Sequence, residues 1–142
     1  MSNFREQLRD NAVALISLTV AVSSLAYNTW RNERTEHNRN IRGATFELLM
    51  KVSELQRVVF LAQYDRDLAG GSPRTGWTYV LAIRDLSTLA PAPLPAQAGE
   101  LQQVWSASWE GLGKDDETAV NRIDDAIGRL RDTTLSTLRS LR

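Results

Sequence analysis

Residues 12–30 read AVALISLTVAVSSLAYNTW and contain no charged side chain. As an α-helix this stretch is about 28 Å long, close to the roughly 30 Å of hydrocarbon in a bilayer. Its length and its lack of charge predict a single transmembrane helix. Aromatic rings favour the headgroup region and arginines favour the water beyond it, so membrane-interface anchors are expected at the C-terminal end. These anchors are Tyr27, Trp30, Arg31 and Arg34.

Two other interpretations of residues 12–30 stay open. The first is a cleaved signal peptide, because Ser24-Leu25-Ala26 has the small-x-small pattern of a cleavage site. Glu6 and Asp10 oppose it, because they interrupt the basic region that such a peptide carries. The second is a buried core helix, because hydroxyl side chains make the stretch only moderately hydrophobic. Residues 1–11 are expected to form a short tail or an interfacial helix.

The arginines near the ends of the stretch predict its orientation. Cytoplasmic flanks of membrane helices are enriched in basic residues. The C-terminal flank carries more of them than the N-terminal flank, so the C-terminal domain is expected in the cytoplasm of a bacterial cell, below a single inner-membrane crossing. The arginines compared are Arg31, Arg34, Arg39 and Arg42 on the C-terminal side and Arg5 and Arg9 on the N-terminal side.

Small side chains recur along the stretch at alternating spacings of three and four, which places them on one helix face. Membrane helices approach closely at such faces, and hydroxyls there can bond between helices. This pattern predicts an interface with a partner helix, from an integral membrane protein or from a second copy of the chain. Alanine and serine are common, so chance is the alternative explanation. The face consists of Ala14, Ser17, Ala21, Ser24 and Asn28.

The composition excludes several classes of function. The chain has 142 residues, and its 17 basic and 17 acidic residues cancel, whereas nucleic-acid-binding proteins usually need a basic surplus. A hydrophobic fraction of 42% predicts a packed core rather than disorder. The sequence has no cysteine, which excludes disulfides, thiolate zinc sites and cysteine nucleophiles. We therefore expect one packed domain and no nucleic acid among its partners.

Residues 31–142 are expected to form a small antiparallel helical bundle, so the fold class is all-α. Glycine and proline divide this part into helices at about residues 35–69, 73–90, 95–112 and 115–141. The polar run after Trp30 has no proline, so the first of these helices is expected to be continuous with the membrane segment. The apolar stripe of this helix repeats at spacings of three and four. It consists of Ile41, Thr45, Leu48, Val52, Leu55, Val59 and Ala62.

Two helix starts carry local signals. Ser72 is expected to cap the helix over 73–90, with Pro73 at its first position. Asp115, Asp116 and Glu117 are expected in the first turn of the last helix, where negative charge is favoured by the helix dipole.

The side chains that carry chemistry are few. His37 is the single histidine, and with Glu33 it forms at most half of a di-iron motif. Asp65 and Asp67 fall at a predicted helix end, where solvation is their expected role. The Gly70-Gly71-Ser72-Pro73 turn lacks the lysine of a phosphate-binding loop. The sequence therefore predicts neither an enzyme nor a cofactor or metal site.

Three tryptophans in the soluble part, Trp77, Trp105 and Trp109, have two interpretations. Trp105 and Trp109 are four residues apart, so both are expected on one helix face, where Trp77 of another helix can meet them. They form either a core cluster or an aromatic pocket or docking surface for a partner.

These patterns favour a non-enzymatic membrane protein that acts as an accessory, assembly or regulatory subunit of a larger membrane complex. The alternative is a membrane-anchored sensor or adaptor whose bundle binds a small ligand or a protein, which requires an apolar cavity near the tryptophans. A third hypothesis is a metal or redox protein that uses His37 from two copies of the chain.

Overall fold

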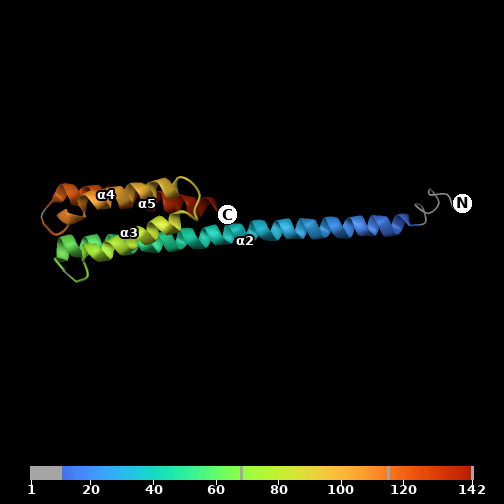
Figure 1. Cartoon of the computed structure of the whole chain (residues 1–142), viewed down its shortest axis with the longest axis horizontal. Helices are drawn as coiled ribbons and strands as arrows, with labels where there is room; N and C mark the ends of the chain where they lie inside the picture. Colours follow the sequence, from blue (N-terminus) through green and yellow to red (C-terminus); the bar gives the residue numbers. More distant parts are fainter. Residues whose placement is uncertain (1–10, 68, 115, 142) are drawn as a thin grey trace. The chain divides into compact units, whose positions relative to one another are not determined.

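The computed structural model describes residues 11–67, 69–114 and 116–141, which contain helices and turns and no strand (Figure 1). The prediction of an all-helical chain is confirmed. The elements in chain order are α2 (Ala12–Phe60), η1 (Leu61–Asp65), α3 (Pro73–Ser87), α4 (Leu94–Ser108), η2 (Trp109–Gly111) and α5 (Glu117–Ser140).

The chain divides into two compact units between Asn38 and Arg39. The described part of the first unit consists of Asn11, in a turn, and the N-terminal part of α2. Of the helices in the described residues, the one that begins at Ala12 is long and apolar enough to cross a membrane by length and composition. The predicted end of a membrane segment at residue 30 lies within this unit and stays a prediction.

The second unit contains a hydrophobic core to which α2, α3, α4 and α5 all contribute. The buried stripe of α2 follows the predicted spacing from Thr45 to Ala62, whereas Ile41 at its start is only half-buried. The largest fully buried side chains of the unit are Trp105, Leu48, Leu55, Ile83, Leu94, Leu101, Ile123, Ile127 and Leu130.

Polar contacts along the edge of this core define the direction of α5 relative to the part of α2 within the second unit. Gln56 Nε2 donates a hydrogen bond to Asp124 Oδ1 at 2.9 Å. One turn earlier in α2, Ser53 Oγ accepts a hydrogen bond from Arg131, also at 2.9 Å. Residue numbers fall along one helix as they rise along the other, so the two segments are antiparallel (Figure 1).

The α-helical part of α2 ends earlier than expected. The prediction placed the end near residue 69, but α2 ends at Phe60 and is followed by the π-helical turn η1. Arg66 then adopts a left-handed conformation with φ of 50°, and this terminates the helix. Asp67 Oδ1 accepts hydrogen bonds from the backbone N–H groups of Ala69, at 2.9 Å, and Gly70, at 3.0 Å. A local side-chain turn therefore replaces the predicted last helical turns.

The starts of α3 and α5 carry the expected signals in part. Pro73 is at the first position of α3, but the Ser72 side chain makes no capping hydrogen bond. Asp116 caps α5, because its Oδ1 accepts a hydrogen bond from the N–H of Ala119 at 3.0 Å. The expectations for Asp115 and for residues 1–10 lie outside the described residues.

The other three helices are also shorter than the sequence predicts, and α5 covers Glu117–Ser140 rather than 115–141. α3 ends at Ser87 rather than at residue 90, because the backbone N–H groups of Thr88, Leu89 and Ala90 bond to carbonyls three residues earlier, all at 3.1 Å, which is a tighter turn than an α-helix. α4 begins at Leu94 and ends at Ser108, and the tighter turn η2 takes the place of its predicted last residues.

Candidate functional site

The main candidate site is the apolar surface of the first unit. From residue 13 to residue 30 every side chain of α2 is exposed, and Ala12 is half-buried. No residue of the most apolar window of this helix is buried within the chain. The large apolar side chains exposed there are Val13, Leu15, Ile16, Leu18, Val20, Val22, Leu25, Tyr27 and Trp30. An exposed apolar surface of this extent is typical of a segment that something other than water covers.

The predicted membrane-interface anchors form a contiguous group on α2. The ring centroids of Tyr27 and Trp30 are 6.2 Å apart, and the ring planes are tilted by 42°. The guanidinium carbon of Arg34 lies 5.6 Å from the centroid of the Trp30 ring, which is the range of a cation–π contact. Arg31 is exposed on the same turn. The aromatic rings and the positive charge therefore meet at one level of the helix.

The predicted partner-helix face is fully accessible. All five of its side chains, Ala14, Ser17, Ala21, Ser24 and Asn28, are exposed. Ser17 Oγ donates a hydrogen bond to the carbonyl of Val13 at 2.8 Å, so the proton of this hydroxyl is used within the helix. A hydrogen bond between the Ser17 hydroxyl and another helix stays a prediction. What this part of the face offers a partner is close packing and a hydroxyl oxygen that can still accept.

The three tryptophans of the soluble part have different environments. Trp105 is fully buried in the core, whereas Trp77 and Trp109 are half-buried and pack against it. Among the ring pairs of the described residues, none joins two of these tryptophans. Trp105 thus belongs to the core, as the first interpretation expects. A docking role for Trp77 and Trp109 stays a prediction.

Gly76 of α3 is the reason that Trp105 fits between α3 and α4. The benzene part of the Trp105 indole lies where a β-carbon on Gly76 would be. The buried Trp105 Nε1 has no hydrogen-bond partner among the residues that the structure describes. The ring is therefore held by packing alone.

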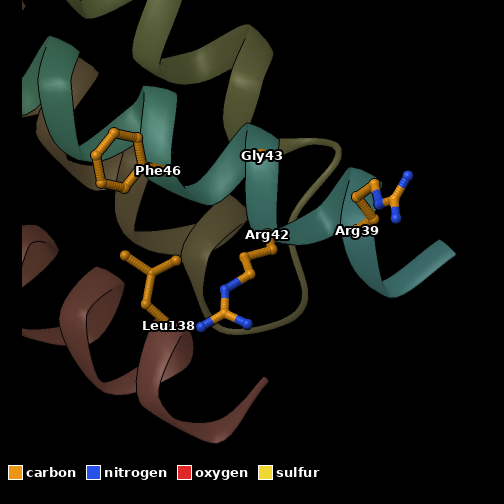
Figure 2. A pocket seen from close by; sticks show the side chains of 5 residues that line it. All are labelled: Arg39, Arg42, Gly43, Phe46 and Leu138. Carbon is orange, nitrogen blue, oxygen red and sulfur yellow. The ribbon is translucent and has the colours of Figure 1, made fainter. Parts of the chain in front are cut away.

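A groove in the second unit was not predicted from the sequence. It has a volume of about 560 Å³ and is lined by Arg39, Arg42, Gly43 and Phe46 of α2 and by Leu138 of α5. Figure 2 shows Arg42 extending toward the α5 ribbon that carries Leu138, with Phe46 on the other side of the hollow and Arg39 pointing away from it. We call it the arginine groove.

A second hollow, of about 410 Å³, lies where η1 and η2 end. Its lining includes Arg66, Asp67, Gly113 and Lys114. Gly113 has a φ of 73°, a conformation that side chains with a β-carbon rarely adopt. Neither of the two hollows has a tryptophan in its lining.

Asp67 gives the second hollow a measurable pH dependence. The backbone N–H groups of Gly70 and Ala69 bond to its carboxylate and hold its pKa below the ordinary value. A lowered pKa means that the ionised form stabilises the turn above the unfolded-state pKa, and that this contribution is lost as pH falls through the folded-state pKa. In an NMR titration, Asp67 should titrate at lower pH than the same aspartate in an unstructured peptide. A midpoint equal to that of the peptide would contradict the turn. The Gly70 N–H bonds to the Asp67 carboxylate, so its amide signal should follow the same titration and should lose this pH dependence in the control variant Asp67→Ala.

The residues considered for metal binding are not brought together. His37 is exposed, as are all residues from 31 to 40. Within the described ranges, no group of three or more histidine, aspartate and glutamate side chains is arranged to hold a metal ion.

The chain matches no protein-family model, and comparison with curated proteins and with solved structures gives no match. The described residues define an all-helical protein with one candidate membrane span, followed by a unit with its own core.

Proposed function

We propose that this chain is a single-pass membrane protein of the bacterial inner membrane, with residues 12–30 in the bilayer and residues 31–142 as a helical bundle in the cytoplasm. The proposal rests on the apolar segment of α2. No residue in the most apolar window of this segment is buried within the chain. The cluster of Tyr27, Trp30 and Arg34 supports it, because such rings and cations favour the membrane interface. The orientation follows from the excess of arginines on the C-terminal side.

The protein acts without catalysis, as an accessory, assembly or regulatory subunit of a larger membrane complex. It packs the small-residue face of its membrane helix, Ala14 to Asn28, on a helix of an integral membrane protein or of a second copy. Small side chains favour this role because they let two helix backbones approach closely, which gains dispersion energy along the whole contact. The bundle then lies on the cytoplasmic side of the partner.

Ala21→Leu should disrupt this contact, because its larger side chain separates the two helix backbones at the centre of the face. We expect the partner to be lost when the full-length variant is purified from its own membranes in mild detergent and its companions are identified by mass spectrometry. Ala26→Leu is the matched control, because five residues at 100° each place Ala26 about 140° around the helix from Ala21. This variant should keep the partner.

Two outcomes would contradict the proposal. If the unaltered protein and both variants are all recovered without a partner, the protein is not a subunit of a larger complex. Equal loss of the partner from both variants would show that the contact does not use the small-residue face.

A further inference from the structure

The arginine groove combines positive charge with an apolar wall. Phe46 is 58% exposed although it lies beside the core stripe of α2, and Leu138 of α5 is half-buried opposite it. The space at Gly43, which also lines the groove, is open, because a β-carbon there would meet nothing within 4 Å. Arg42 extends toward α5 beside the side chains of Phe46 and Leu138 (Figure 2). A ligand that fits has an anionic group next to a hydrocarbon part.

Among the described residues, no acidic side chain neutralises the two arginines of the groove. Neither Arg39 nor Arg42 has an ion pair or a side-chain hydrogen bond within the part of the chain that the structure describes. An arginine that extends over an apolar wall with no acidic partner is suited to bind a phosphate, since its guanidinium presents several N–H donors.

The position of the groove in the sequence identifies the source of the phosphate. Arg39 follows Trp30 by nine residues, a length of chain that spans at most about 32 Å even when fully extended. If residues 12–30 cross a bilayer, this connection keeps the groove within reach of its headgroups. Anionic lipids of the cytoplasmic leaflet attract basic segments of this kind.

We propose that the arginine groove binds an anionic phospholipid of the membrane that the chain crosses, with Arg42 on the phosphate and Phe46 and Leu138 against the adjoining hydrocarbon. This inference rests on the proposed membrane anchoring. It gives the bundle a docking point on the lipid surface.

Photocrosslinking of the full-length protein tests the proposal. The photoreactive analogue p-benzoylphenylalanine replaces Phe46, and the protein is placed in nanodiscs of equal amounts of phosphatidylglycerol and phosphatidylcholine. After illumination, mass spectrometry counts the adducts of each lipid. We expect adducts mainly with phosphatidylglycerol, and Arg42→Gln should lower the ratio of the two lipids about fivefold.

Three variants serve as matched controls. The same analogue at Phe60, which is 52% exposed on the same helix, should show no preference for phosphatidylglycerol. Arg122→Gln, which removes an exposed charge outside the groove, should leave the ratio unchanged. Gly43→Leu should lower the adducts of both lipids at position 46, because it fills the groove, and its higher helix propensity keeps α2 folded.

The outcomes separate this inference from the proposed function. Equal labelling of both lipids from position 46, or a ratio insensitive to Arg42→Gln, in a protein embedded in the nanodisc would overturn the lipid site alone. A protein that does not co-purify with the nanodisc would overturn the membrane anchoring, and the lipid site with it.

Discussion

Trp105→Ala should lower the free energy of unfolding by about 3–5 kcal/mol, a large part of the roughly 5–15 kcal/mol of a typical domain. The ring is fully buried between α3 and α4, and an alanine would leave a cavity of most of its volume. Urea unfolding of the full chain in mild detergent, followed by circular dichroism, measures the change. Trp105→Phe should cost much less, because it keeps most of the ring and removes the buried Nε1 donor, which has no partner in the described part of the chain.

Gly76 provides an internal control for this prediction. Gly76→Ala places a β-carbon within the Trp105 ring, and such overpacking costs about 1–3 kcal/mol. In a chain that already carries Trp105→Ala the ring is absent, so the same substitution should cost little or nothing. Additive effects of the two substitutions, or a loss below about 1 kcal/mol for Trp105→Ala, would contradict the packing of α3 against α4.

Val20→Arg should prevent residues 12–30 from entering a bilayer. An arginine near the centre of a membrane helix costs about 3 kcal/mol. For a helix whose inserted and non-inserted states are about equally populated, this cost lowers the inserted fraction by roughly a hundredfold. Val20 is exposed near the middle of the segment and outside the small-residue face. Translation of the full chain in the presence of membrane vesicles, followed by flotation, gives the fraction that is inserted.

The matched control for this substitution is Met50→Arg. Met50 is an exposed apolar residue of the same helix α2, but it lies in the second unit. This variant should float with the vesicles like the unaltered chain. Equal flotation of Val20→Arg and the unaltered chain would contradict a membrane location for residues 12–30.

The helices and most of the core could be predicted from the sequence, because local periodicity determines which face of a helix is buried. The residues from Thr45 to Ala62 that keep the spacing of three and four are buried, and Pro73 begins α3 as its fixed φ predicts. The end of α2 was less predictable. It depends on the left-handed Arg66 and on the Asp67 carboxylate, which close a turn where the periodicity alone predicts continued helix.

The arginine groove and the role of Gly76 could not be predicted, because each depends on residues far apart in the chain. The groove has a second wall only because the fold brings Leu138 of α5 close to Arg42 and Phe46 of α2. Gly76 matters only because α4 places Trp105 against it. Sequence patterns identify the residue types at these positions but not which helix packs against them. The pairing of helices is determined by the whole core.

The central claim is that residues 12–30 anchor the intact chain in a membrane. Alkaline extraction of cell membranes, combined with the intact mass of the protein that remains in the pellet, tests it most directly. We predict that the protein resists extraction and that its mass includes residues 12–30. Release into the supernatant would contradict the membrane anchor, and a mature protein that begins after Ala26 would show that the segment is a cleaved signal peptide.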